Sequence, residues 1–402
     1  MLSDPASPIF AIVAIVVAFF YAALLARLFP AHIQAARIST LDGLRGFLVI
    51  SVFLHHACIW FFYIKTSKWQ LPPSYFYGNL GQISVSLFFM ITAFLFFSKL
   101  LRATEEPIDW GRFYISRFMR LGPIYFLMLL TVCCIVMYKT DFLLHDAPAN
   151  ILRSLIKWIP FGILGLPDIN GHRSTAIIVA HVIWSLPYEL IFYAALPLIG
   201  FFVGTKRQVL PFLLSICACT FIVEQMHYPS LLQLSIFLGG IVAAYCARYS
   251  GLRAFCSGRF AGCVALLCLG LVFFMPPTDY GWKSVLLLSV VFIIIACGNS
   301  LFGVLLHRGI RLVGDMGYSV YLLHGIILFV TFDGYVRTGV SQAINGLMFW
   351  AVVCALIFPL ITICYITFRF IELPAMGASL PLHARILRLL RRPASVAPAT
   401  QG

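Results

Sequence analysis

The feature that most constrains this chain is a succession of apolar runs, each about as long as a lipid bilayer is thick. A helix needs roughly 20 apolar residues to cross the hydrocarbon core, and such runs recur from Ile9 almost to Arg369. Hydrophobic residues make up 61% of the 402 positions and charged residues 10%, whereas about 25% charge is typical of soluble domains. A water-soluble enzyme is excluded. The runs also lack the alternation of an outer-membrane barrel, so we expect an all-α polytopic membrane bundle.

We predict about eleven spans: a ten-span core preceded by an extra span in the amino-terminal segment 1–38. Because basic residues follow that first run rather than precede it, it is expected to be an uncleaved anchor. Residues 39–376 form the main membrane domain, and the basic tail 377–402 is expected to be disordered and to contact lipid headgroups. The predicted spans are residues 9–29, 44–64, 80–101, 121–138, 177–203, 209–223, 231–247, 260–275, 282–302, 312–332 and 343–368.

The net charge of +14 is better explained by topology than by a nucleic-acid partner, since the basic residues are scattered between apolar runs. Placing the amino terminus outside puts 20 of the 28 Lys and Arg residues on the cytoplasmic side, as the positive-inside rule requires. We therefore expect a multi-pass protein of the cell membrane, a bacterial inner membrane, with a cytoplasmic carboxyl terminus. No cysteine or histidine spacing typical of a metal site occurs, and no metal is expected.

The second predicted span carries ionisable groups that are costly in a membrane and are functional candidates for that reason. Arg45 and His56 are eleven residues apart, which on a helix is three turns plus about 20° and a climb of about 16 Å. They therefore share one face, with Asp42 placed to hold the guanidinium of Arg45. His55 points about 100° away and is expected to be structural. The alternative is that Arg45 anchors the topology and the histidines only bridge helices.

Two further segments place charge at the membrane. Arg117 and Arg120 are one helical turn apart before the fourth span, a geometry that suits phosphate groups, although a positive-inside cluster explains them equally well. Glu189 lies inside the fifth span, where a carboxylate needs a cationic or hydrogen-bonding partner.

At these residues the chain resembles the acyltransferase 3 family of integral-membrane acyltransferases, over about residues 39–374. The segment from Leu41 to Gly46, followed by His56, resembles the family's first-helix signature, and residues 86–95 resemble its LFFxxSGFL run with Thr92 and Ala93 in place of Ser and Gly. Other matches are the RxxR of Arg117 and Arg120, the WSLxxExxFY run that contains Trp184 and Glu189, the YSLYLxH-like run with Tyr318, Tyr321 and His324, and the ExP of Glu372 and Pro374.

The resemblance implies an O-acyltransferase that uses acyl-CoA, most simply acetyl-CoA, as a donor substrate and has no bound cofactor. It implies phosphate contacts at Arg45, Arg117 and Arg120, with supporting roles for Asp42, Trp184, Tyr318, Tyr321, His324 and Glu372. An imidazole can act as base or nucleophile, so His56 is the predicted catalytic residue, with Glu189 orienting the acceptor hydroxyl or pairing with an arginine. His324 is equally well explained by packing.

The expected acceptor is a cell-surface carbohydrate or its lipid-linked precursor, and membrane lipids are the surroundings. The competing interpretation is a transporter or flippase of such a glycan, because polytopic bundles with charges near mid-membrane often carry substrates. The absence of a repeated half or of paired broken spans disfavours it.

Overall fold

The structure is a computed structural model that describes residues 4–29, 38–103, 107–203, 208–226, 229–277, 281–338 and 344–390. Apart from one isolated bridge between Ile169 and His172, every regular element in these residues is helical, which confirms the all-α prediction. The first elements are α1 (Pro8–Leu28), α2 (Ser39–Thr66), α3 (Tyr75–Arg102), α4 (Trp110–Lys139), α5 (Pro148–Trp158), η1 (Thr175–Val179), η2 (Val182–Ser185), α6 (Leu186–Val203) and α7 (Val209–Gln225). They are followed by α8 (Leu231–Cys246), α9 (Ser250–Cys256), α10 (Arg259–Phe273), α11 (Trp282–Ala296), η3 (Val304–Leu306), α12 (Arg308–Asp315), α13 (Gly317–Thr338), α14 (Gly346–Thr367), the π-turn η5 (Phe368–Glu372), α15 (Leu373–Gly377) and α16 (Ser379–Leu390).

The helices confirm a polytopic bundle, but they fall into two length classes. Each of the eleven predicted runs overlaps a helix of the structure. Seven helical segments of the described chain are long and apolar enough to cross a membrane, and α8 with α9, bent by 112° at their junction, adds an eighth if the pair is one span. The apolar helices α7, α10 and α11 are shorter, between 15 and 17 residues.

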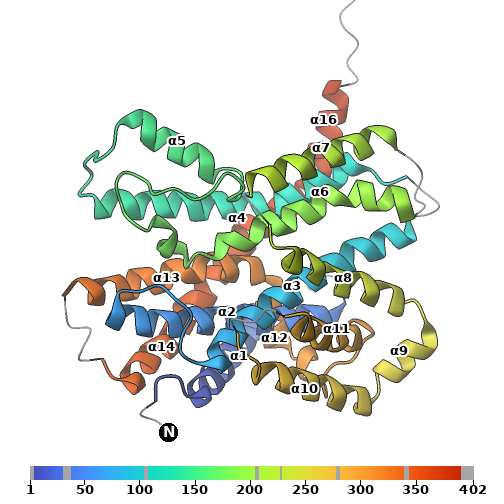
Figure 1. The fold of residues 1–402 in the computed structure, drawn as a ribbon, viewed down its shortest axis with the longest axis horizontal. Helices are drawn as coiled ribbons and strands as arrows, with labels where there is room; N and C mark the ends of the chain where they lie inside the picture. Colours follow the sequence, from blue (N-terminus) through green and yellow to red (C-terminus); the bar gives the residue numbers. More distant parts are fainter. Residues whose placement is uncertain are drawn as a thin grey trace, which may run out of the picture.

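The helix α2 lies near the centre of the bundle and packs against α3, α12 and α13 (Figure 1). Glycines make this packing possible. A Cβ atom on Gly43 would lie 1.9 Å from the carbonyl oxygen of Leu305, and one on Gly46 would lie 2.1 Å from a carbonyl oxygen of α12. Only residues without a side chain let backbones approach so closely. The first turns of α2, with Asp42 and Arg45, are thereby fixed against α12.

Two of the predicted spans are interrupted, which corrects the expectation of continuous helices. In the fifth, Ala180 and His181 have φ values of 50° and 57°, and α6 begins only at Leu186 with Pro187 in its first turn. Proline suits that position because its missing N–H would have no helical partner there. The tenth is divided into α12 and α13 at Met316.

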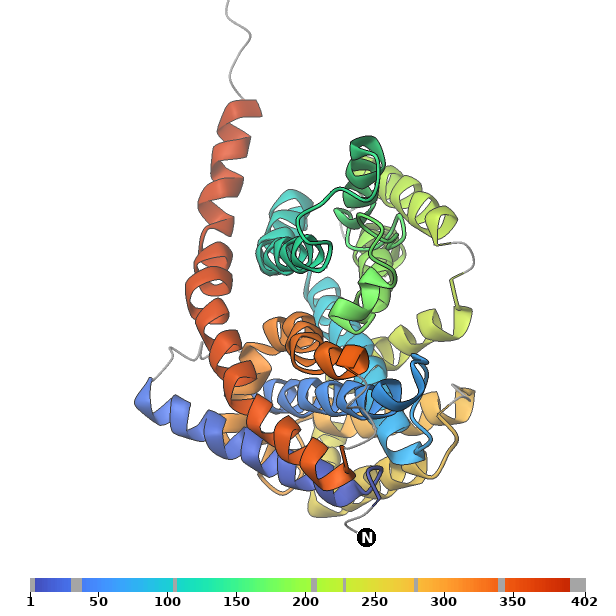
Figure 2. The same cartoon turned by 90° about the vertical axis from the view of Figure 1, so that its left-hand side faces the viewer.

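The carboxyl-terminal segment also differs from the prediction. Residues 379–390, expected to be disordered, form α16, and α14, η5, α15 and α16 make a long rod that extends past the bundle (Figure 2). The rod is tied to α4, since Nε2 of His383 lies 3.4 Å from a carboxylate oxygen of Asp109, the N-cap residue of α4. The predicted disorder of residues 391–402 concerns positions outside the described residues.

Candidate active site

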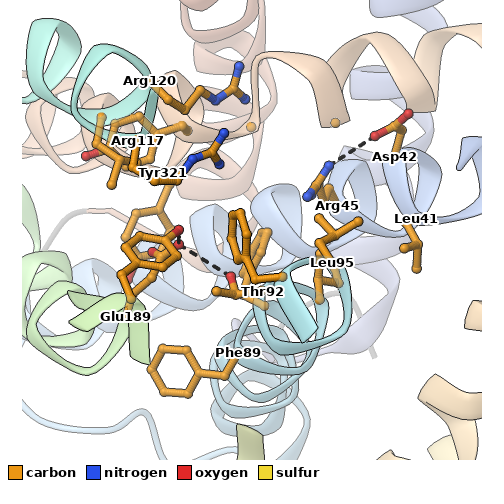
Figure 3. Close-up of a pocket in the computed structure, with 18 of the residues that line it drawn as sticks. Leu41, Asp42, Arg45, Phe89, Thr92, Leu95, Arg117, Arg120, Glu189 and Tyr321 are labelled. Carbon is orange, nitrogen blue, oxygen red and sulfur yellow. Dashed lines mark hydrogen bonds and ion pairs between the residues drawn. The ribbon is translucent and has the colours of Figure 1, made fainter. Parts of the chain in front are cut away.

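A cavity of about 420 Å³ opens between α2, α3, α4, α6 and α13 (Figure 3). Four segments far apart in the sequence contribute the charged and phenolic side chains that were singled out from motifs. Its lining includes Asp42, Arg45, Arg117, Arg120, Glu189, Tyr318 and Tyr321. The structure thus assembles the predicted donor arginines and the predicted carboxylate around one space.

Arg45 is held by Asp42, as the sequence predicted. Its Nη1 lies 3.1 Å from Oδ1 of Asp42, whose side chain is only 4% exposed, while that of Arg45 is 26% exposed. Asp42 sits in the first turn of α2, where the helix dipole favours a negative charge. The pair therefore presents a positioned guanidinium at the cavity.

Arg117 and Tyr318 each bring a buried donor to the cavity. The guanidinium of Arg117 lies over the ring of Phe96, 4.9 Å from its centroid. The Nε of Arg117 and the hydroxyl of Tyr318 are buried and have no hydrogen-bond partner in the described part of the chain. Leaving a buried donor unsatisfied costs about 1–3 kcal/mol. A ligand with acceptor oxygens would satisfy both groups.

Arg120 lines the same cavity but is tied to the protein. Its Nη2 donates to the carbonyl oxygen of Asp315 at 3.2 Å, and its Nη1 lies 3.7 Å from Oε2 of Glu372. The Glu372 carboxylate is buried, and its other oxygen accepts a hydrogen bond from Ser319. The predicted RxxR and ExP motifs are therefore joined in space, and Arg120 holds η5 against α12 and α4.

Glu189 faces the cavity from the first turn of α6. Its Oε1 accepts hydrogen bonds from Oγ1 of Thr92, at 3.3 Å, and from the hydroxyl of Tyr193. Tyr193 was not among the predicted site residues, although its spacing of four residues from Glu189 is the signal for a contact along one helix face. Trp184, predicted to support the site, is 41% exposed and packs edge-on against Tyr188 instead of lining the cavity.

The neighbouring residues Thr92 and Ala93 make different contacts. Thr92 donates its hydrogen bond to Glu189, whereas Ala93 faces α8. A Cβ atom on Gly240 of α8 would lie 2.7 Å from that of Ala93 and 2.2 Å from the carbonyl oxygen of Met90. Replacement of the usual Ser and Gly by Thr and Ala therefore keeps a hydroxyl at the site and a small side chain at the helix crossing.

His56 forms a pair with His324. The Nδ1 of His56 lies 3.0 Å from the carbonyl oxygen of Val52 and 3.1 Å from Nε2 of His324, whose own Nδ1 lies 2.9 Å from the carbonyl oxygen of Val320. Carbonyl oxygens only accept hydrogen bonds, so each Nδ1 carries the proton and each Nε2 keeps its lone pair. The single N–H on Nδ1 of His56 is then shared between the carbonyl oxygen of Val52 and Nε2 of His324, and Nε2 of His56 is left as a base.

The histidine pair does not line the cavity. Tyr321 connects the cavity with the histidine pair, since it lines the cavity and its ring centroid is 6.3 Å from that of His324. Its hydroxyl is bonded to Ser185 Oγ at 2.7 Å and to the carbonyl oxygen of Val182 at 2.9 Å. His55 is buried, and its Nδ1 bonds the carbonyl oxygen of Tyr77 at 2.8 Å, a packing contact between α2 and α3.

Within the described residues, no group of three or more His, Cys, Asp or Glu side chains is arranged to hold a metal ion.

Comparison with known proteins agrees with these motifs. An acyltransferase domain model matches residues 38–369. A protein of Bacillus subtilis (strain 168) named "Putative peptidoglycan O-acetyltransferase YrhL" is 26% identical over 374 residues, which cover 84% of this chain and 54% of that protein. The chain thus spans about half the length of this relative. No solved structure matches the chain. The family model covers most of the sequence, and the chain belongs to the acyltransferase 3 family of membrane acyltransferases.

Proposed function

We propose that the protein transfers an acyl group, in the simplest case acetyl, from acyl-CoA to a hydroxyl of a cell-surface carbohydrate or of its lipid-linked precursor. The observation that carries the donor assignment is the cavity that Arg45 lines together with Arg117 and Tyr318, the last two of which each bring a buried donor with no partner among the described residues. Buried guanidinium and hydroxyl donors suit the amide oxygens of an extended thioester donor and a carbonyl oxygen that gains charge during reaction.

The histidine pair supplies the base that such a transfer needs. Nε2 of His56 takes the proton from the acceptor hydroxyl as the oxygen attacks the thioester carbonyl. The oxyanion of the tetrahedral intermediate accepts hydrogen bonds from the cavity donors, and its collapse breaks the C–S bond. The departing thiolate takes the proton from His56, which restores the imidazole. His324 orients His56, and the thioester has to pass Tyr321 to reach it.

A carbohydrate acceptor is favoured by the similarity to the Bacillus subtilis protein, whose name gives peptidoglycan as its acceptor. The decisive experiment supplies labelled acetyl-CoA to the purified protein in detergent micelles, with a cell-wall or surface glycan as acceptor, and seeks the acetyl mass on the product by mass spectrometry. Micelles hold no gradient, so an acyltransferase turns over in them. A glycan transporter, the competing function, would release no free CoA and modify no glycan.

The proposed topology places the amino terminus outside and the carboxyl terminus in the cytosol of a bacterial inner membrane. Labelling of single cysteines by a membrane-impermeant reagent tests it. Labelling of the tail beyond Arg385 in intact cells would reverse the topology and would place the cavity arginines outside.

A further inference from the structure

A second cavity, of about 680 Å³, adjoins the first. The two have Ile38, Leu95 and Arg102 in common. Arg102, Arg248 and Arg253 line the second cavity, and no carboxylate of the described residues does. Its charge therefore differs from that of the first cavity, where Asp42 and Glu189 offset part of the positive charge.

The helix packing explains why these three arginines meet. The helices α3 and α8 pack closely against each other where they cross at Gly240. At their shared end α3 finishes at Arg102, while the chain bends by 112° between α8 and α9. Arg248 lies in that bend and Arg253 on α9, and all three arginine side chains are exposed. The Nε of Arg102 bonds the carbonyl oxygen of Ser98 at 3.2 Å, which leaves its terminal nitrogens for other acceptors.

We propose that the second cavity binds the phosphorylated nucleotide of acyl-CoA, while the first cavity receives the pantetheine arm and the thioester. This inference rests on the proposed function. Coenzyme A has two chemically distinct parts: a nucleotide with a 3′-phosphate and a diphosphate, and a long arm with amides and no charge. The second cavity, lined by three arginines and by no carboxylate of the described residues, matches the first part. The first cavity, lined by apolar side chains, hydroxyl groups and charges of both signs, matches the second part.

Three donors and two variants test this division. The donors are acetyl-CoA, acetyl-dephospho-CoA, which lacks the 3′-phosphate, and S-acetyl-pantetheine, which lacks every phosphate. The test variant is Arg248→Gln/Arg253→Gln. Arg259→Gln is the matched control, because Arg259 is exposed at the start of α10, six residues after Arg253, and lines neither cavity.

The double variant should raise the KM for acetyl-CoA by about 10- to 100-fold, the value of one or two charge-assisted hydrogen bonds, and change kcat by less than about twofold. Its KM for S-acetyl-pantetheine should equal that of the wild type. Adenosine 3′,5′-bisphosphate should compete with acetyl-CoA in the wild type and in Arg259→Gln but lose its inhibition in the double variant. Equal losses with all three donors would overturn the proposal.

A lipid headgroup is the other source of phosphate chemistry, and vesicles separate the two. If the arginines bind lipid, wild-type activity will depend on phosphatidylglycerol in otherwise phosphatidylcholine vesicles, the double variant will lose that dependence, and the nucleotide will not compete. That result overturns the nucleotide assignment but leaves the acyltransferase intact. If the wild type transfers acetyl from no thioester at all, the proposed function itself fails.

Discussion

The helices α2 and α13 contribute both to the cavity and to the histidine pair, yet the polar groups of the two regions are held in different ways. Each histidine directs Nδ1 at the carbonyl oxygen four residues earlier in its own helix, so its orientation follows from local backbone geometry. The cavity arginines come from separate segments, and although Asp42 holds Arg45 within one helix, Arg120 depends on a distant partner, Glu372. Local contacts therefore orient His56 in the absence of a ligand. The buried donors of Arg117 and Tyr318, by contrast, have no partner among the described residues and would gain one from a ligand.

This contrast separates two kinds of residue. A change to the histidine pair should alter the chemical step and leave donor binding almost intact. A change to the cavity should alter donor binding or the stability of the bundle.

The largest effect is expected for His56→Ala, which removes the base. The rate of transfer should fall at least about 100-fold, and more if an acyl-histidine forms, while the Kd for acetyl-CoA should change by less than about threefold. Single-turnover transfer and equilibrium binding of labelled donor measure the two quantities. His55→Ala is the matched control on the same helix, since the Nδ1 of His55 bonds the backbone of Tyr77 rather than His324. Should His55→Ala be inactive and His56→Ala active, the catalytic role assigned here would be wrong.

Arg120→Ala should mainly destabilise the bundle. The substitution removes the guanidinium near the buried carboxylate of Glu372 and the hydrogen bond to Asp315. Loss of a charged hydrogen-bond partner in a buried setting costs about 1–3 kcal/mol, which thermal unfolding in detergent should register as a lowered midpoint.

Arg117→Ala is the counterpart within the same RxxR motif. It should leave the unfolding midpoint nearly unchanged but weaken binding of acetyl-CoA by about tenfold. Equal losses of stability and of binding for the two variants would show that the arginines act as a unit, contrary to the geometry.

His324→Ala should lower kcat by about tenfold, because His56 loses one acceptor for its Nδ1–H. KM for the donor should stay close to the wild-type value. His324→Gln, which can present an amide oxygen at the same place, should recover part of the rate. A packing role alone would make both variants equally defective in stability and leave the pH profile of kcat unchanged.

Much of the fold was accessible from the sequence because membrane helices follow from apolar length alone. The Asp42–Arg45 pair was accessible for a different reason, since helix periodicity places residues three apart on one turn. The joining of Arg120 to Glu372 could not be derived, because 251 residues separate them and no local pattern encodes their meeting. The αL backbone at His181 and the helical α16 were also missed, since apolar or basic composition does not specify where a helix is interrupted or continued.

The smallest effect is expected at Thr92, whose hydroxyl donates to Glu189 at the edge of the cavity. Thr92→Ala removes one neutral donor from a carboxylate that Tyr193 also serves, so the rate should fall by only about two- to tenfold. Thr92→Ser keeps the hydroxyl and should retain nearly full activity. Paired measurement of kcat and KM for both variants decides whether Glu189 needs this contact. If Thr92→Ser were as impaired as Thr92→Ala, the methyl group rather than the hydroxyl would matter, and Thr92 would belong with Ala93 to the packing of α3 on α8.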